Sequence, residues 1–322
     1  MTRPIVTVTR RLPQAVEAEL REEFDVRLNT DDLPLDAAAL RRALESSDAL
    51  LCTVTDRLDR ATLGPPPVRA RIAANFGVGF NHIDLSAARD LGLVVTNTPG
   101  VLTEATAELA MTLMLMVARR VTEGERELRA GKWTGWRPTH LMGRGLGGRI
   151  LGIVGMGRIG RSVARRAANG LGMRIEYFTR TPTQEDDALG RRCESLAELL
   201  ANADVVSLHA PATSETKRMI GAKELRQMKR DAVLINTARG DLVDEEALAD
   251  ALLEGALHGA GLDVYEHEPS VHPRLLRLDN VVLLPHLGSA TEDARIGMGR
   301  RAIENLRAFF AGKEPPDRVP GA

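Results

Sequence analysis

The chain is short of cysteine and has almost no net charge, and each shortage excludes a class of protein. Its two cysteines, Cys52 and Cys193, are far apart, which suits neither a disulfide framework nor the paired spacing of a zinc site. We therefore expect a reducing compartment, the cytoplasm, and no bound metal. The 43 basic and 44 acidic side chains leave a net charge of −1, which gives no global field to attract nucleic acid or an anionic membrane.

Long hydrophobic runs are also missing. The most apolar stretch, residues 109–118, is much shorter than the roughly 20 residues that span a bilayer. The N-terminus runs straight into an alternating pattern, without the apolar core of a signal peptide. What remains is a globular composition of 43% hydrophobic and 27% charged residues, in a chain of 322 residues that is too long for one ordinary core. We expect two domains.

Short β-branched runs alternate with helical patterns along the whole chain, which predicts parallel sheets built from βαβ units. The fold class expected is α/β, with two doubly wound parallel-sheet domains and a cleft between them. The expected strands are residues 5–9, 25–28, 49–54, 71–76 and 94–97 in the first half, and 149–154, 174–178, 204–208, 233–236, 260–264 and 281–284 in the second.

Two long helical patterns, residues 103–121 and 292–310, suggest where the domains divide. We expect residues 1–100 plus 287–322 to form one domain, with the last helix returning to the first half, and residues 101–286 to form the other. The first helical pattern is apolar on more than one face, which fits a core helix and an oligomer interface equally. Residues 123–147 have the composition of an irregular arm, rich in glycine and arginine, that carries Trp133 and Trp136.

A glycine loop follows the predicted strand at 150–154 and opens a helical stretch. Its residues are Gly155, Met156, Gly157, Arg158, Ile159 and Gly160. The first glycine would permit a tight turn, the second would let the backbone approach a pyrophosphate, and the third would let helix and strand pack closely. The free N–H groups of the helix N-terminus would face the phosphates. In a chain with 29 glycines a simple turn is the alternative, but the strand–loop–helix context predicts a Rossmann dinucleotide-binding domain.

The residues after the next strand indicate which dinucleotide binds. Thr179 stands where an NAD site usually has an acidic residue, and Arg180 and Thr181 follow it. A carboxylate would repel a ribose 2′-phosphate, whereas an arginine between two hydroxyls would bind one. The pattern favours NADP(H), with NAD(H) as the alternative if Arg180 is merely solvated.

Three late segments each follow a predicted strand, which is where open α/β sheets bind their ligands. They are residues 236–240 (Asn-Thr-Ala-Arg-Gly), 262–269 (Leu-Asp-Val-Tyr-Glu-His-Glu-Pro) and 284–289 (Leu-Pro-His-Leu-Gly-Ser). Together with the glycine loop, residues 75–84, the tryptophan arm and residues 209–211, they resemble the D-2-hydroxyacid dehydrogenase family, and within it the glyoxylate/hydroxypyruvate reductases. The resemblance covers nearly the whole chain and goes beyond a shared fold. It implies a flavodoxin-like substrate domain beside the Rossmann domain, and an oxidoreductase that reduces glyoxylate or hydroxypyruvate with NADPH.

The resemblance also implies a catalytic set of Arg239, Glu268 and His286. Reduction of a 2-keto acid requires a hydride at C2, a proton for the developing alkoxide and a cation for the carboxylate. Arg239 would bind the carboxylate and polarise the carbonyl, and His286 would donate the proton. Glu268 would lie against the imidazole and favour its charged form; Glu266 is the rival for this role.

Further contacts are implied only by the resemblance. Cofactor contacts beyond the glycine loop and residues 179–181 are expected from Thr106, His209, Ala210, Pro211, Thr237, Ala238, Asp263 and Gly288. Substrate contacts are expected from backbone N–H groups of Val78 and Gly79, in addition to Arg239. Asn81 departs from the aspartate usual at its position. The apolar helix and the tryptophan arm indicate a homodimer, as in relatives.

Several alternatives stay open. Formate dehydrogenases have glutamine where Glu268 stands here, and many phosphoglycerate dehydrogenases carry an additional C-terminal domain for which this chain has no room. A D-lactate-type or phosphoglycerate-type dehydrogenase nevertheless remains a candidate. A non-catalytic, nucleotide-sensing corepressor of the same fold is a candidate of another class, and turnover of a keto acid would distinguish it.

Overall fold

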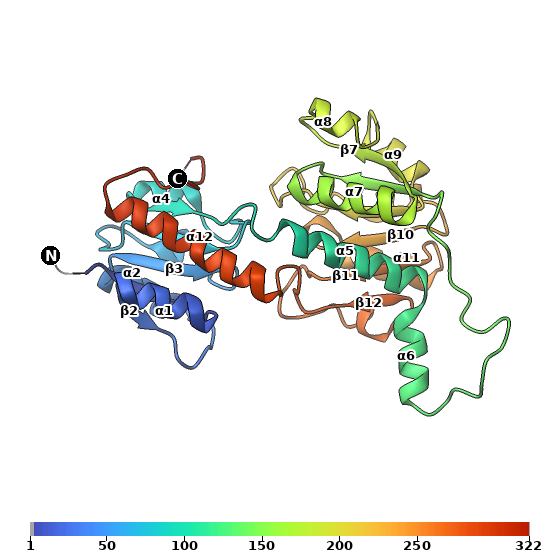
Figure 1. Ribbon diagram of the computed structural model, residues 1–322, viewed down its shortest axis with the longest axis horizontal. Helices are drawn as coiled ribbons and strands as arrows, with labels where there is room; N and C mark the ends of the chain where they lie inside the picture. Colours follow the sequence, from blue (N-terminus) through green and yellow to red (C-terminus); the bar gives the residue numbers. More distant parts are fainter. Residues whose placement is uncertain (1–2, 322) are drawn as a thin grey trace. The chain divides into compact units, whose positions relative to one another are not determined.

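The computed structural model describes residues 3–321, which form two compact units (Figure 1). One unit comprises the described residues up to Leu102 together with those from Ala290 onward, and the other comprises Thr103–Ser289. These boundaries lie a few residues from the expected ones. Each unit is built on its own parallel sheet with helices on both faces, so the predicted α/β fold class is confirmed.

The first unit contains a five-stranded sheet of order β2-β1-β3-β4-β5, in which all neighbours are parallel. This is the flavodoxin-like order of a doubly wound sheet. The expected strands are correct to within one residue at each end: β1 (Ile5–Val8), β2 (Asp25–Leu28), β3 (Ala49–Thr53), β4 (Ile72–Phe76) and β5 (Val94–Thr96).

Helices cover this sheet, and most of them begin at a side-chain cap. They are α1 (Gln14–Glu23), α2 (Ala37–Ser46), α3 (Arg60–Leu63), α4 (Leu85–Asp90) and α12 (Glu292–Phe310). The side chains of Asp36, Asp59, Asp84 and Thr291 accept backbone N–H groups at the starts of α2, α3, α4 and α12. Helix α12 packs on α1 so closely that a Cβ added to Gly299 would lie 2.4 Å from Val16. The end of the chain therefore completes the first unit.

The second unit contains a seven-stranded parallel sheet of order β12-β11-β10-β9-β6-β7-β8. The chain order reverses between β6 and β9, which is the crevice where Rossmann folds bind dinucleotides. Only the short β8 was not expected. The strands are β6 (Ile150–Val154), β7 (Arg174–Phe178), β8 (Arg191–Arg192), β9 (Val205–Leu208), β10 (Val233–Asn236), β11 (Gly259–Leu262) and β12 (Val281–Leu283).

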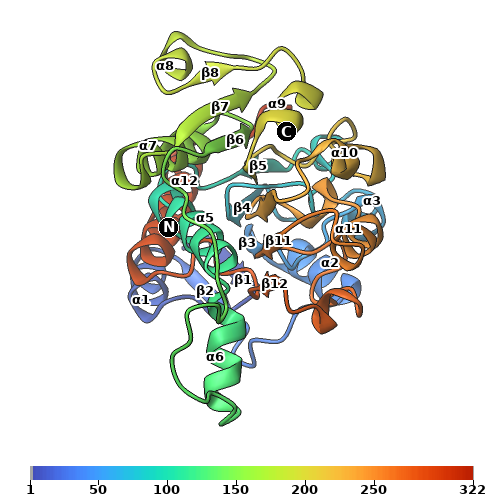
Figure 2. The same cartoon turned by 90° about the vertical axis from the view of Figure 1, so that its right-hand side faces the viewer.

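Two apolar layers cover the faces of this sheet, and alternating strand residues supply both. Leu234 belongs to one layer and its neighbour Ile235 to the other. Figure 2 shows α5 and α7 on one side and α10 and α11 on the other. The helices are α5 (Thr103–Ala118), α6 (Val121–Arg129), α7 (Arg158–Leu171), α8 (Gln184–Asp187), α9 (Leu196–Asn202), α10 (Ala222–Gln227) and α11 (Glu245–Leu253), with 3₁₀ turns at Gly240–Leu242 and Leu275–Arg277. No helix in residues 3–321 combines the length and apolar character needed to cross a membrane.

The prediction of one helix over 103–121 followed by an irregular arm over 123–147 is wrong for Val121–Arg129, which form a separate helix, α6. Arg120 adopts a left-handed conformation, φ 54°, which ends α5 and starts α6. Ion pairs of Arg120 with Glu123 and of Arg129 with Glu125 stabilise α6. None of its side chains is buried, and its large apolar residues are Val121 and Leu128 alone, which gives the sequence little apolar content to reveal a helix.

Candidate active site

The imidazole of His286 and the carboxylate of Glu268 meet at the carboxyl ends of β12 and β11. His286 Nδ1 lies 2.8 Å from Glu268 Oε2, and about a third of each side chain is exposed, 30% and 34%. The second Glu268 oxygen accepts the N–H of Tyr265 at 3.1 Å. The rival carboxylate of Glu266 is bound elsewhere, because Arg218 Nε donates to it at 2.6 Å.

The surroundings of Glu268 keep it ionised. Burial alone would raise its pKa, but the hydrogen bond and charge of His286, the N–H of Tyr265 and the charge of Arg239 together hold the pKa of Glu268 below its ordinary value. A carboxylate at this distance accepts the Nδ1 proton of the imidazole. Nε2 is then the ring nitrogen that can exchange a proton with another molecule.

A second carboxylate holds the loop that carries His286. His286 has a left-handed backbone, φ 55°, which is uncommon for a side chain of this size. Its N–H donates to the carbonyl oxygen of Asp263 at 2.9 Å. The two carboxylate oxygens of Asp263 accept the N–H groups of Leu287 and Gly288, at 2.6 and 2.8 Å. Thr106 Oγ1 donates to the Gly288 carbonyl at 2.9 Å. Three expected cofactor contacts, Thr106, Asp263 and Gly288, thus shape the histidine loop.

The loop that carries Arg239 is shaped by two residues for which the sequence analysis gave no role. Asn236, the last residue of β10, accepts the N–H of Ala238 at 3.0 Å and donates to the Arg239 carbonyl at 2.8 Å. Gly240 lies directly against the turn after β11, and a Cβ added to it would lie 1.9 Å from the carbonyl carbon of Tyr265. Only glycine permits this approach. In the sequence, the pair Arg239-Gly240 directly after a predicted strand is the pattern that could have indicated this close approach.

The guanidinium of Arg239 is half-buried and donates to the Ala238 carbonyl at 2.6 Å. Burial lowers its pKa from the ordinary value, while the charges of Glu268 and Asp241 act in the opposite direction. An arginine remains charged under any such shift. The carboxyl ends of β10, β11 and β12 therefore present a cation, a carboxylate and an imidazole, respectively.

Each glycine of the loop after β6 has its own reason to lack a side chain. Gly155 has φ +95°, and a Cβ on it would lie 2.8 Å from the backbone of Ala210. A Cβ on Gly160 would lie 2.3 Å from the Gly155 carbonyl oxygen, where α7 packs on β6. No atom lies within 4 Å of a Cβ added to Gly157, and no side chain caps the start of α7. This open position and uncapped N-terminus fit a pyrophosphate.

The remaining expected cofactor residues lie in this loop or follow β9 and β10. Thr237 is buried, and its hydroxyl has no hydrogen-bond partner among the described residues. His209 Nε2 lies 2.9 Å from Ser207 Oγ, and burial lowers the pKa of His209 to about 4, which keeps the ring neutral. The carbonyl of Pro211 accepts a bond from Thr216. Met156 instead packs its side chain in the core, while Arg158 is exposed at the start of α7; Ile159 is half-buried and packs against that core.

Residues 179–181 follow β7, the neighbour of β6. The side chain of Arg180 pairs with Glu215, from the segment after β9. Thr179 is half-buried and Thr181 exposed. The guanidinium of Arg180 is thus held by a carboxylate at the surface, with both side chains of the pair exposed.

In the first unit, amide side chains hold the Gly77–Gly79 turn by its carbonyl groups. Asn75 Nδ2 donates to the carbonyls of Gly77 and Gly79 at 3.1 and 3.0 Å, and Asn97 Nδ2 donates to that of Val78 at 2.8 Å. Within residues 3–321 the N–H groups of Val78 and Gly79 have no hydrogen-bond acceptor. The turn can therefore offer two donors to an anion.

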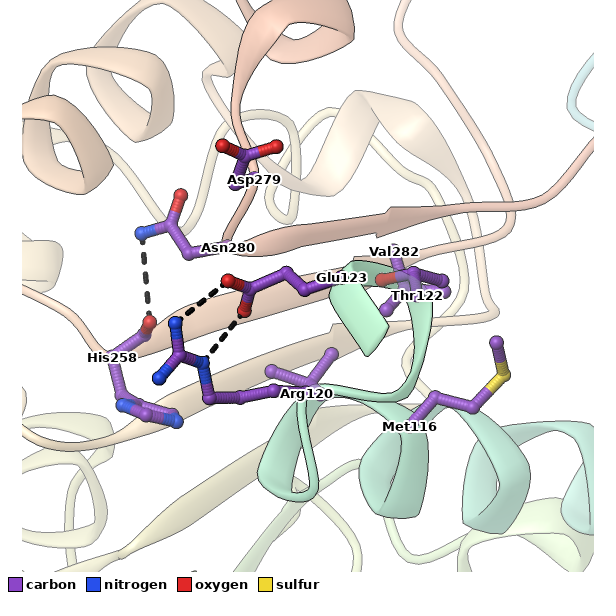
Figure 3. A pocket seen from close by; sticks show the side chains of 9 residues that line it. Met116, Arg120, Thr122, Glu123, His258, Asp279, Asn280 and Val282 are labelled. Carbon is purple, nitrogen blue, oxygen red and sulfur yellow. Dashed lines mark hydrogen bonds and ion pairs between the residues drawn. The ribbon is translucent and has the colours of Figure 1, made fainter. Parts of the chain in front are cut away.

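A cavity of about 460 Å³ lies at the amino-terminal ends of strands β11 and β12 of the larger sheet. His258 and Asn280, which line it, immediately precede β11 and β12, whereas the catalytic candidates follow these strands. Figure 3 shows the ion pair of Arg120 and Glu123 in its lining, between His258 on one side and Met116 from α5 on the other. This cavity is distinct from the edge that carries Arg239, Glu268 and His286.

Comparison with known proteins gives a consistent set of relatives. The model of the "D-isomer specific 2-hydroxyacid dehydrogenase, NAD binding domain" matches residues 111–288. A glyoxylate reductase of Thermococcus litoralis is 44% identical over 98% of this chain and 97% of its own. One from Aeropyrum pernix is 46% identical over 99% and 96%. The crystal structure of an NADPH-dependent glyoxylate/hydroxypyruvate reductase of Sinorhizobium meliloti, in complex with NADP and malonate, is 34% identical, with a TM-score of 0.88 over 99% of this chain and 98% of that one.

Proposed function

As a member of the D-isomer specific 2-hydroxyacid dehydrogenase family, this chain is an NAD(P)-dependent reductase of small 2-keto acids, and we propose that it reduces glyoxylate or hydroxypyruvate with NADPH, using Arg239, Glu268 and His286 as its catalytic set. The observation that carries the assignment of residues is the 2.8 Å contact between His286 and Glu268, beside Arg239 at the same edge of the sheet.

The chemistry follows from the charges of these side chains. Arg239 binds the substrate carboxylate and polarises the adjacent carbonyl. A dinucleotide held at the glycine loop would supply the hydride for C2 from its nicotinamide. His286 donates the proton from Nε2 to the oxygen that gains charge, while Glu268 holds Nδ1 and stabilises the imidazolium that is the donor. In the oxidation direction the same Nε2 accepts the hydroxyl proton.

The proposed cofactor site is formed around the glycine loop. The open side of Gly157 and the uncapped start of α7 would accept the pyrophosphate. The unpartnered hydroxyl of Thr237 offers a further polar contact. We assign the preference for NADPH over NADH to Thr179–Thr181, with Arg180 as the ligand of the 2′-phosphate, because no carboxylate follows β7 in the position that would repel it.

The proposed substrate contacts of the first unit are the N–H groups of Val78 and Gly79, which the carbonyl-directed bonds of Asn75 and Asn97 leave available. A pair of backbone donors suits a carboxylate. This feature supports 2-keto acids as a class and does not select the substituent on C2.

We also propose a cytoplasmic homodimer. Cys52 and Cys193 are both buried free thiols, which suits a reducing compartment. Trp133 and Trp136 are 52% and 83% exposed within one short segment, and large apolar side chains exposed close together mark a protein interaction surface. Light scattering after gel filtration tests the dimer: a monomer mass at micromolar concentration would reject it.

The deciding experiment follows the loss of reduced-nicotinamide absorbance with glyoxylate and hydroxypyruvate, with NADPH and NADH in parallel. D-Lactate-type and phosphoglycerate-type reactions are assayed beside them with pyruvate and phosphohydroxypyruvate. Faster turnover of glyoxylate or hydroxypyruvate with NADPH supports the proposal. Faster turnover with NADH rejects the preference for NADPH, and cofactor binding without turnover of any of these acids favours a nucleotide-sensing role.

A further inference from the structure

We infer that Glu215 is a specificity-determining residue that competes with the ribose 2′-phosphate of NADP(H) for the guanidinium of Arg180. The inference rests on the proposed role of Arg180. The observation behind it is the ion pair between these two side chains, which are 35 positions apart in the sequence.

The strand order explains why two such distant residues meet. Strands β7 and β9 lie on either side of β6 in the sheet, so the segments after their carboxyl ends flank the glycine loop. Arg180 follows β7, and Glu215 belongs to the segment after β9. A group bound beside the glycine loop on the β7 side is therefore within reach of both side chains.

The backbone on each side of the pair is fixed by other contacts. Before Glu215, the N–H of Thr213 donates to Thr216 Oγ1 at 2.8 Å, and that hydroxyl donates to the Pro211 carbonyl at 2.7 Å. These bonds close a turn around Glu215, so its carboxylate moves by rotation of its side chain.

The loop after Arg180 is held in a similar way. Arg161, from α7, donates to the buried carboxylate of Asp186 at 2.6 Å and to Thr183 Oγ1 at 2.9 Å. The N–H of Thr183 also donates to Asp186, at 2.8 Å. In contrast, the side chains of Arg180 and Glu215 are 62% and 69% exposed. The pair can therefore open by side-chain rotation while both backbones stay in place.

Charge determines the direction of the effect. A 2′-phosphate carries close to two negative charges and needs the guanidinium for charge-assisted hydrogen bonds. Glu215 must release Arg180 first, and its carboxylate then remains near the phosphate and repels it. A ribose 2′-hydroxyl has no such conflict, because a carboxylate can accept its hydrogen bond. Glu215 thus weakens the binding of NADP(H) and leaves that of NAD(H) unchanged or tighter.

The test is calorimetric titration of the full-length protein with 2′,5′-ADP and with 5′-AMP, which differ only in the 2′-phosphate. Glu215→Gln is expected to bind 2′,5′-ADP about fivefold more tightly, the upper range for an exposed ion pair, and 5′-AMP no more tightly than the original protein does. The gain should shrink as salt is raised. Glu185→Gln is the matched control: this carboxylate is 79% exposed and pairs with Arg161 rather than Arg180, so no gain is expected.

Arg180→Gln, alone and combined with Glu215→Gln, separates this inference from the proposal on which it rests. If Arg180→Gln weakens 2′,5′-ADP and abolishes the gain from Glu215→Gln, the competition is supported. If Arg180→Gln weakens 2′,5′-ADP but Glu215→Gln changes nothing, Arg180 keeps its role and the inference about Glu215 is rejected. If Arg180→Gln has no effect, the proposed phosphate contact is itself rejected, and the inference with it.

Discussion

The backbone N–H of His286 donates to the carbonyl oxygen of Asp263 at 2.9 Å, and the carboxylate of Asp263 accepts the next two N–H groups of the same loop. One buried residue thus holds three consecutive donors of the loop in which His286 has a positive φ. Such backbone conformations persist only where the surrounding contacts enforce them. The placement of the proposed proton donor therefore depends on Asp263 as well as on Glu268.

Asp263→Asn should weaken the hydrogen bonds that hold the backbone of this loop. An amide keeps one acceptor and places an N–H₂ group against a backbone donor, so we expect the free energy of unfolding to fall by about 1–3 kcal/mol. Turnover should fall by about 10–100-fold, because small displacements of a catalytic group are costly. Urea unfolding and kcat measure the two effects. Asp279→Asn, an 81% exposed aspartate at the surface, is the control, and a turnover equal to that of the control would reject the positioning role.

His286→Gln should remove the proton donor while keeping a side chain that can bond to Glu268. We expect kcat to fall by about 10²–10⁴-fold and the dissociation constant of NADPH to change little. His140→Gln serves as the control, since it removes another His–Glu contact, with Glu127 at 2.7 Å, in the arm after α6. Unchanged turnover in His286→Gln would remove this residue from the mechanism.

Two substitutions in the glycine loop should have opposite effects. Gly157→Ala has open space around its new methyl group, so stability should be retained while the affinity for NADPH falls about tenfold, because the methyl occupies the approach to the phosphates. Gly160→Ala would place its Cβ 2.3 Å from the Gly155 carbonyl oxygen and should cost about 1–3 kcal/mol of stability. Thermal unfolding and NADPH titration distinguish the two, and equal loss of stability in both would contradict this assignment of their roles.

The pH dependence of stability should reveal His209. Its pKa is lowered to about 4 in the folded protein, against about 6.5 in the unfolded chain. The unfolded state therefore binds a proton that the folded state does not, and stability falls as pH decreases from about 6.5 towards 4. His209→Asn should flatten this part of the curve. Urea midpoints measured across that range provide the test, and parallel curves for the two proteins would show that His209 titrates normally.

Apart from the short, exposed β8, the strands of both sheets were predictable from sequence because their apolar, β-branched runs lie between helical patterns. Helix α6 was not, because none of its side chains is buried and its stability comes from charged pairs such as Arg129 with Glu125. A helix shows regularly spaced apolar residues in its sequence when one of its faces packs against other elements. An exposed helix of this kind has the composition of a loop.

Within the candidate site, residue types were easier to predict than contacts. Glu266 and Glu268 lie in one turn and have the same chemistry; what separates them is Arg218, 48 positions from Glu266, which binds one carboxylate and leaves the other to His286. The partner of Arg180 depends likewise on which strands flank β6. The dependence of the Arg239 loop on Gly240 is a matter of distance to Tyr265. Such relations follow from strand order and close approach, and no short segment of sequence contains them.

The path of the chain through the two units has a consequence for biosynthesis. Helix α12, which covers α1 and β4 of the first unit, is translated only after the whole of Thr103–Ser289. The dinucleotide-binding unit is therefore complete in sequence before α12 is made, whereas α1 and β4 must wait for this last helix before the surface that they share with it is covered. A nascent chain that stops shortly after residue 289 would contain Arg239, Glu268 and His286 and yet leave this surface of the first unit exposed to chaperones and proteases. Quality control of this enzyme would then act mainly on its N-terminal residues.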